Sequence, residues 1–139
     1  MKLRVATPAD RDALIAIDPI AAESAKRRAN IMAWVETGEC TIAEIDGAVA
    51  GYGVLNDRFF GNGFIEMVMV GEPFRRRGVG RALVEHFKDI CREPKLFAST
   101  NSSNRPMQHL LFDAGFRPSG TIDNLDEGDP EMVFFRRIS

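Results

Sequence analysis

Along the chain, apolar residues form strand-like runs in some segments and recur at the 3.6-residue spacing of a helix in others. This pattern predicts strands that alternate with helices. Residues 64–70, Phe-Ile-Glu-Met-Val-Met-Val, form an apolar and β-branched run that is typical of a strand. A few residues later, apolar side chains recur at helical spacing from Val79 to Ile90, with charged residues between them. The pattern therefore predicts a strand, a short loop and a helix over 79–91.

The remaining elements follow from the same two periods and from turn residues. Asp46-Gly47 is a hairpin signal between two of the strands. Thr7, Pro8 and Asp10 form a helix start that resembles a capping box, with Asp in place of Glu or Gln. No linker or repeat interrupts the series, so we expect one domain over residues 1–139. Strands are expected at 3–6, 40–46, 48–55, 95–100, 116–122 and 131–138, and helices at 8–18, at 20–37 and after Asn104.

The loop between the strand at 64–70 and its helix reads Arg75-Arg76-Arg77-Gly78-Val79-Gly80. A helix start directs free backbone N–H groups at one point, where the helix dipole also favours an anion. Two glycines let a ligand approach the backbone closely, and the arginines add positive charge. The loop therefore indicates a pyrophosphate site, although a plain glycine-containing turn gives the same string. It matches neither the Walker A pattern nor Gly-x-Gly-x-x-Gly, which disfavours a nucleotide triphosphatase and a dinucleotide-binding fold.

A second segment, Asn104 to Phe116, reads as a short helix with capping signals at both ends. Asn104 is a good N-cap, Pro106 lies in the first turn, and Gly115 is placed to end the helix in a left-handed conformation. With the strand that carries Glu66 and the arginine-glycine loop, this segment resembles the GNAT superfamily of acyl-CoA-dependent N-acetyltransferases. The resemblance covers about half of the chain.

The resemblance implies an α/β (α+β) fold with a mixed, strongly twisted sheet of about seven strands and helices on both faces. In that fold two neighbouring parallel strands, here 64–70 and 95–100, splay apart and admit the pantetheine arm of acetyl-CoA. The backbone at residues 68–70 should meet the pantetheine and the thioester. The N–H groups of residues 76–81 should bind the pyrophosphate, and Asn104 should hydrogen-bond the pantetheine arm. The expected cofactor-binding residues are Val68, Met69, Val70, Arg75, Arg76, Arg77, Gly78, Val79, Gly80, Arg81 and Asn104.

The catalytic positions depart from the family pattern. An alkyl amine, with a pKa of about 10.4, must lose a proton before it attacks a thioester. Many family members place a tyrosine acid where this chain has Leu111, and the sole tyrosine, Tyr52, lies in an earlier strand. A base position of some relatives is Ser99 here. Glu66 is the remaining candidate, as a general base acting through water, and an exposed or paired strand carboxylate is the equal alternative.

Three stretches usually wall the acceptor site in this fold: the first two helices, the segment before the Glu66 strand and the last loop between strands. The second is residues 56–63, in which Phe59 and Phe60 fit either a pocket or a strand core. The third is residues 124–131, with four carboxylates in six residues. A cationic amine or polyamine would be attracted to that loop. A solvated turn explains the same residues.

Composition bounds the class of protein. With 139 residues and 45% apolar composition, the chain can bury one proper core. A net charge of −2 does not indicate a nucleic-acid-binding module. We see no signal peptide and no membrane span in the sequence. Cys40 and Cys91 suit neither a metal site nor a disulfide framework, so no metal is expected and both read as free thiols of a cytoplasmic protein.

These observations together predict an acetyl-CoA-dependent N-acetyltransferase. The acetyl group would pass to a primary amine by direct attack in a ternary complex, and the acceptor could be a small amine, a polyamine or a protein amine. The alternative is a non-catalytic acyl-CoA-binding domain that has lost the general acid, which Leu111 favours. The sequence leaves the oligomeric state open, a homodimer included.

Overall fold

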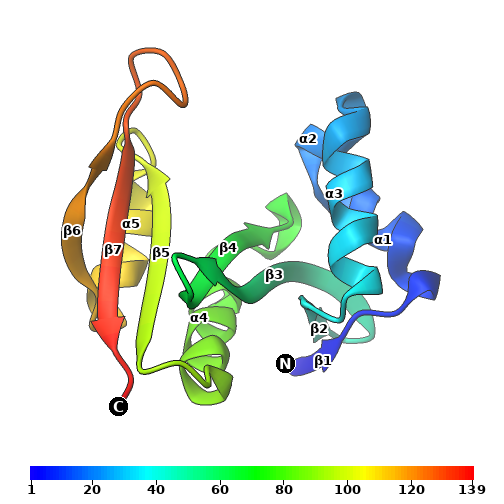
Figure 1. The fold of residues 1–139 in the computed structure, drawn as a ribbon. Coiled ribbons are helices and arrows are strands. Elements are labelled where there is room, and N and C mark those ends of the chain that lie inside the picture. The colour runs from blue at the N-terminus through cyan, green and yellow to red at the C-terminus, as the bar shows by residue number, and fades with distance from the viewer. The chain divides into compact units, whose positions relative to one another are not determined.

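The computed structural model describes all 139 residues, and its seven strands form one mixed sheet in the order β1-β2-β3-β4-β5-β7-β6 (Figure 1). β4 and β5 are parallel, whereas the pairs β1–β2, β2–β3, β5–β7 and β6–β7 are antiparallel. The mixed α/β fold with seven strands is therefore confirmed.

The strands are β1 (Lys2–Val5), β2 (Cys40–Ile45), β3 (Ala48–Phe59), β4 (Asn62–Val70), β5 (Lys95–Asn101), β6 (Arg117–Ile122) and β7 (Glu131–Arg137). The helices are α1 (Arg11–Ile17), α2 (Pro19–Glu23), α3 (Ala25–Glu36), α4 (Val79–Ile90) and α5 (Arg105–Asp113), with 3-10 turns at Pro8–Asp10 and Glu72–Phe74.

The chain divides into two compact units. The first consists of Met1–Leu55 and Met67–Leu83, and the second of Asn56–Glu66 and Val84–Ser139. The division runs through β3, β4 and α4, so each of these elements contributes residues to both units. None of the helices combines the length and the apolar composition that crossing a membrane requires.

In the first unit, helices cover both faces of the strands. α1, α2 and α3 pack their apolar side chains on β2 and β3, where Ile42, Tyr52 and Val54 are fully buried. Gly51 faces the opposite side, because neighbouring strand residues alternate. A Cβ at Gly51 would lie 2.6 Å from the Met69 carbonyl oxygen and 2.9 Å from Val79 Cγ1. The missing side chain therefore allows the first turn of α4 to pack closely on this face.

A buried polar network fixes the helices of the first unit. The Tyr52 hydroxyl donates to Asp18 Oδ2 at 2.7 Å, and Arg27 donates to the same oxygen at 2.9 Å. The other oxygen of Asp18 accepts from the Ile20 and Ala21 amides and so begins α2. Tyr52 and Asp18 are both fully buried. One carboxylate therefore joins β3, α2 and α3.

The helix predicted over 20–37 was wrong as a single element, because it is broken at Ser24 into α2 and α3. Ser24 is extended, and its hydroxyl accepts from the Arg27 amide at 3.1 Å as the N-cap of α3. A serine that bonds a nearby amide competes with helix continuation, which explains the break. The signal was present in the sequence but lay inside an apparently continuous helical pattern.

We predict that Tyr52→Phe destabilises the protein but leaves unchanged the acetyltransferase activity that the sequence resemblance implies. The change removes a hydrogen bond to a buried carboxylate, which should lower the free energy of unfolding by about 1.5–3 kcal/mol. Burial, followed by the bond to Asp18, raises the pKa of Tyr52, so this phenol is no general acid at neutral pH. Denaturant unfolding and transfer rates of the folded variant check both statements. A rate loss of several orders of magnitude would show that the tyrosine enters the reaction.

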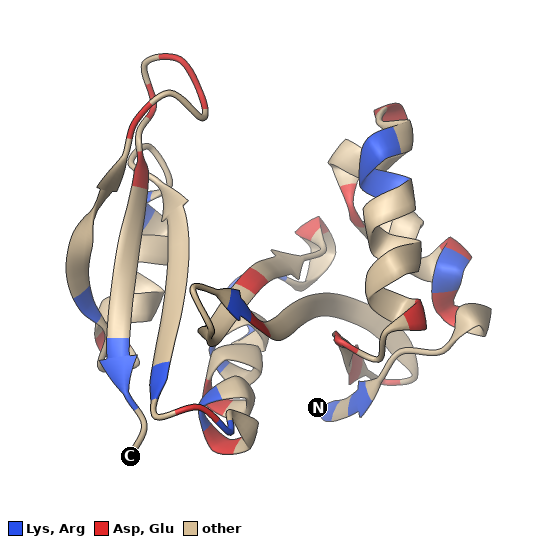
Figure 2. Cartoon of the chain, in the orientation of Figure 1, with Lys and Arg blue, Asp and Glu red and all other residues tan.

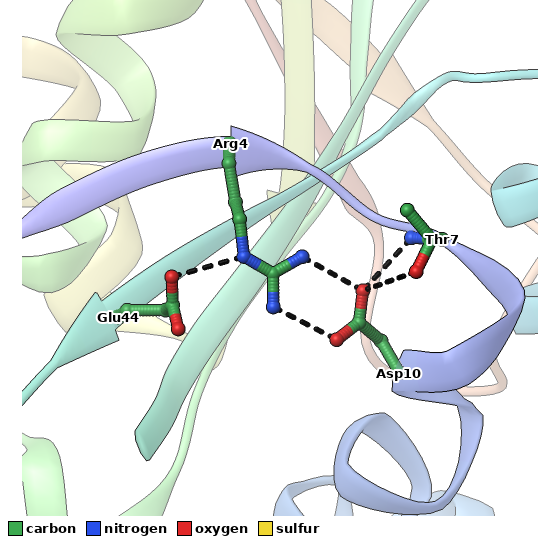
Figure 3. Close-up of polar contacts among 4 residues, drawn as sticks. All are labelled: Arg4, Thr7, Asp10 and Glu44. Atoms are coloured by element: carbon green, nitrogen blue, oxygen red, sulfur yellow. Dashed lines mark hydrogen bonds and ion pairs between the residues drawn. The ribbon is translucent and has the colours of Figure 1, made fainter. Parts of the chain in front are cut away.

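At the start of the chain, Arg4 joins β1 to β2 and to the first 3-10 turn (Figure 3). Its guanidinium donates to both oxygens of Asp10 at 2.8 Å and to Glu44 at 2.9 Å. The Thr7 amide donates to Asp10 at 2.8 Å, which is the contact that the capping box predicts. These bonds, above all those from Arg4, lower the pKa of Asp10 from 3.8 to about 2.

We therefore predict an acid-dependent loss of stability that comes from Asp10. Because its pKa is lower in the folded than in the unfolded protein, the stabilisation is complete above about pH 4 and is lost as the pH falls towards 2. Its size should be about 1–2 kcal/mol. Unfolding free energies of wild type and Asp10→Asn from pH 6 to pH 2 should converge in that window. The side chain of Asp12 is 94% exposed, so Asp12→Asn serves as the control. Its unfolding free energy should change with pH in the same way as that of the wild type.

In the second unit, β5, β7 and β6 lie side by side with α5 against them (Figure 1). β3 extends through Phe59, and β4 begins at Asn62. Both strands are therefore longer than the predicted 48–55 and 64–70, and only Phe60 and Gly61 form the turn, with φ of 54° and 78°. Two left-handed residues suit a tight hairpin turn, for which phenylalanine is an unusual choice. Phe59 packs on Phe64 and Phe97, whereas Phe60 is 91% exposed.

Candidate functional site

The strand-loop-helix segment predicted to bind a pyrophosphate lies in the first unit. After β4 ends, the Gly71 amide donates to the Ala50 carbonyl at 2.8 Å, and the Glu72–Phe74 turn leads into the arginines. Residues 75–78 are exposed, and α4 begins at Val79, whose side chain is buried. The predicted geometry is thus present, with a buried apolar anchor directly behind an exposed loop.

The backbone of this loop leaves its N–H groups unpaired. The amides of residues 76–78 donate to no other group of the protein, and the next three begin α4 and have no acceptor within the helix. Arg76 and Gly78 have φ of 65° and 80°, in the left-handed region. Backbone that alternates in this way turns successive N–H groups inward and forms a concave anion site. The left-handed arginine could not be foreseen from the sequence, because non-glycine residues rarely adopt it.

The side chains around the loop add charge and shape. The Arg77 guanidinium lies over the Phe74 ring, 5.9 Å from its centroid, which holds a positive charge beside the loop. A cavity of about 310 Å³ lies next to it, lined by Ala16, Ile17, Pro19 and residues 72–75. The loop therefore combines backbone donors with cationic side chains, as an anionic phosphate group requires.

The strand that precedes the loop has a short pairing with β5. Three residue pairs form it, Gly63 with Leu96, Phe64 with Phe97 and Ile65 with Ala98, and β4 continues to Val70. Val68, Met69 and Val70 are half-buried and belong to the first unit, as does the loop. These are the residues whose backbone was predicted to meet pantetheine.

Glu66, the candidate base, lies on β4 in the second unit with its side chain 36% exposed. Its Oε1 atom accepts from Asn56 Nδ2 at 2.7 Å and lies 3.8 Å from an Arg58 nitrogen. Oε2 accepts no hydrogen bond within the protein. The carboxylate is therefore held through one oxygen, and the other is left without a hydrogen-bond donor from the protein.

Asn104, also in the second unit, is the N-cap of α5, because its Oδ1 atom accepts from the Met107 amide at 3.2 Å. Its side-chain NH₂ group donates to no group of the protein, so it can still donate to a ligand. Leu111, where many family members place a tyrosine, is fully buried. The acid position is thus part of the core of the second unit.

Figure 2 shows that the loop between β6 and β7 carries acidic residues. Asp126 and Asp129 bond the turn between β5 and α5, whereas Asp123 and Glu127 are exposed and have no such bond. No group of three or more His, Cys, Asp or Glu side chains gathers where it could hold a metal ion.

Comparisons with known proteins agree with this arrangement. The model of the acetyltransferase (GNAT) family matches residues 11–116, more than half of the sequence, and the chain belongs to this family. A GNAT-family acetyltransferase from Bacillus cereus is 32% identical, with a TM-score of 0.91 over 98% of this chain and 96% of that one. No protein of curated function matches the sequence significantly.

Two more distant solved structures share the fold. A Salmonella typhimurium protein solved with its cofactor acetyl-CoA is 22% identical, with a TM-score of 0.82 over 100% of this chain and 94% of that one. Ribosomal-protein-alanine N-acetyltransferase from Brucella melitensis is 23% identical, with a TM-score of 0.81 over 99% of both chains. The family match confirms the family predicted from the sequence, and these two structures share its fold.

Proposed function

We propose that the protein is an acetyl-CoA-dependent N-acetyltransferase that moves the acetyl group to a primary amine by direct attack in a ternary complex. The observation that carries this proposal is the exposed loop of unpaired N–H groups at residues 76–81. A concave row of amides at a helix start suits the pyrophosphate of a coenzyme A thioester. The relative solved with acetyl-CoA supports the same ligand.

Three parts of the chain would divide the coenzyme between them. The loop and its arginines, Arg75 to Arg77, would bind the pyrophosphate. The main chain of residues 68–70 would pair with the pantetheine arm, and the free NH₂ group of Asn104 would donate to one of its carbonyl oxygens. In this proposal the two units work as one acetyltransferase domain over residues 1–139.

Glu66 is the proposed general base. The ammonium form of the acceptor loses its proton through a water molecule to Oε2 of Glu66, the oxygen that has no protein partner. The amine nitrogen then attacks the thioester carbonyl carbon, and the C–S bond breaks so that the coenzyme leaves as a thiolate. The nitrogen loses its second proton to solvent water, which gives the neutral amide. A thiol pKa of about 8.5 allows that thiolate to leave without a dedicated protein acid.

The cysteines do not suit a covalent route. Burial raises the pKa of Cys40 to about 12 and also raises that of Cys91. Both thiols are therefore protonated at neutral pH, whereas a nucleophilic cysteine needs its thiolate form. This supports direct transfer to the amine without an acetyl-enzyme.

The second candidate function is a non-catalytic acyl-CoA-binding domain. It is favoured by the buried Leu111 at the usual acid position and by the buried phenol of Tyr52, which together leave no tyrosine acid. Both functions predict acetyl-CoA binding, so binding alone does not separate them. Turnover with an amine does.

The test is release of free thiol from acetyl-CoA across a panel of amines: small alkyl amines, polyamines, and peptides with a free N-terminus or a lysine. The panel includes an N-terminal alanine peptide, because one structural relative is a ribosomal-protein-alanine N-acetyltransferase. If the protein is an enzyme, one class of amine should cause release of free thiol, and the rate of release should rise with the concentration of that amine. Binding of acetyl-CoA without amine-dependent release for any class would establish the binding domain instead.

A further inference from the structure

The turn that leads from β5 into α5 is held by one carboxylate from the loop between β6 and β7. Asp129, between β6 and β7, accepts through Oδ1 from the Ser102 hydroxyl and from the Ser103 amide, both at 3.0 Å. Its Oδ2 accepts from the Ser103 hydroxyl at 2.6 Å. Three donors from two consecutive residues thus meet a single side chain, and all of them belong to the second unit.

Further bonds hold the same turn from both sides. The Ser102 amide donates to the Pro130 carbonyl at 2.8 Å, and Asn101 Nδ2 donates to Asp126 at 2.8 Å. From α5, Gln108 Nε2 donates to the Ser102 carbonyl at 2.7 Å and to the Asn101 carbonyl at 3.2 Å. The turn is therefore fixed on one side by the β6–β7 loop and on the other by the helix that it begins.

Asn104 directly follows Ser102 and Ser103 at the end of this turn. Its amide donates to the Asn101 carbonyl at 2.9 Å, so its backbone position follows that of the turn. Its Oδ1 atom caps α5, which leaves the NH₂ group pointing away from the helix amides. Fixing Ser102 and Ser103 thereby fixes the direction of a free donor only one residue further along the chain.

We propose that Asp129 is a positioning residue for acetyl-CoA, which holds the β5–α5 turn so that Asn104 presents its side-chain NH₂ group to the pantetheine arm. This rests on the proposed function, in which Asn104 contacts that arm. A preorganised donor binds more tightly, because the cost of ordering the turn is met during folding rather than on binding. The loop acids then serve coenzyme affinity and not only attraction of a cationic acceptor.

Because the loop is acidic, Asp129 could instead serve to attract a cationic acceptor. Glu127 provides a control that distinguishes this role from the positioning of Asn104. Glu127 belongs to the same loop and carries the same charge, but it makes no bond to the turn. If Asp129 acted only by attracting a cationic acceptor, neither Asp129→Ala nor Glu127→Ala would weaken the affinity for acetyl-CoA. If it positions Asn104, only Asp129→Ala weakens the affinity for acetyl-CoA.

The experiment is calorimetric titration of acetyl-CoA, without acceptor, into the full-length chain and its variants. Asp129→Ala and Asn104→Ala should each raise the Kd about tenfold, and Glu127→Ala should change it less than about twofold. The double variant Asp129→Ala/Asn104→Ala should bind no more weakly than Asn104→Ala alone, because one residue acts through the other. Ser103→Ala removes the hydroxyl donor to Asp129 and leaves the backbone amide donor in place, so it should raise the Kd by only about threefold.

A purely structural role for Asp129 would give a different result. It would lower the melting temperature without changing the Kd of the folded protein, or its effect would add in full to that of Asn104→Ala. Either result overturns the proposal. If Asp129→Ala does not fold, the same two comparisons are made with Ser103→Ala. Failure of the wild type to bind acetyl-CoA would instead remove the proposed function itself, and the inference with it.

Discussion

Replacing Gly78 by valine is expected to abolish acetyl-CoA binding. Gly78 has φ of 80°, a conformation that a β-branched residue strongly disfavours, and its neighbouring amides are the proposed pyrophosphate donors. A valine would turn these N–H groups away or place its methyl groups in front of them. Arg76→Ala should weaken binding much less, because a screened charge beside a helix start contributes only about 0.3–1 kcal/mol. Equilibrium titration with acetyl-CoA measures both variants.

Gly38 offers a matched control for that experiment. It lies in the turn after α3 with φ of 77°, and no atom lies within 4 Å of a Cβ built there, as is also true of Gly78. Gly38→Val therefore carries similar backbone strain in similar open space, away from the loop. It should lose stability and keep its affinity for acetyl-CoA. Wild-type affinity in a folded Gly78→Val would exclude the loop as the pyrophosphate site.

The second large effect is expected from Glu66→Gln, which should lower the rate of acetyl transfer by about 10²–10⁴-fold. Glutamine keeps an oxygen for Asn56 but cannot take a proton from the acceptor. Acetyl-CoA affinity should persist, because the coenzyme is proposed to use the backbone of residues 68–70 and not this side chain. Transfer rates and the acid limb of the pH–rate profile check this when the chemical step limits the rate.

Asp57→Asn is the control for charge, since Asp57 is an exposed carboxylate on β3 in the same unit. It should leave the rate close to wild type. An unchanged rate and an unchanged pH profile in Glu66→Gln would mean that the amine loses its proton to bulk water. The transferase assignment would survive that result, but the role of Glu66 would not.

The sequence predicted those parts of the structure that depend on neighbouring residues. Asp46-Gly47 forms its hairpin turn with φ of 52° and 79°, and Asn104 caps α5 as its type and position indicate. The arginine-glycine loop was found because a strand, two glycines and a helical pattern follow one another directly. In each case a few adjacent side chains decide the backbone conformation, so a local reading of the sequence was enough.

Contacts between distant residues could not be predicted in this way. Tyr52 bonds Asp18 across 34 positions, and Asp129 bonds Ser103 across 26. The acids at 126 and 129 therefore read as part of a charged loop, although their bonds go to the β5–α5 turn. The extension of β3 to Phe59 was missed as well, because a Phe-Gly turn lacks the usual Asn-Gly signal.

Leu111 shows how the structure changes the meaning of a motif position. The family pattern suggests that a tyrosine restored there would supply an acid. Leu111 is fully buried, so a larger phenol would overpack the core of the second unit. A compact leucine suits this buried position, and the proposed reaction accordingly releases the coenzyme as a thiolate without a tyrosine donor.

The most direct test of the central claim follows a labelled acetyl group from acetyl-CoA, first with the protein alone and then after addition of the amine that releases most thiol. Direct transfer in a ternary complex predicts no label on the protein before the amine is added, and afterwards one acetyl group on the amine nitrogen for each thiol released. Acetyl-CoA that binds but never passes its label to an amine would contradict the account, as would label that first accumulates on the protein.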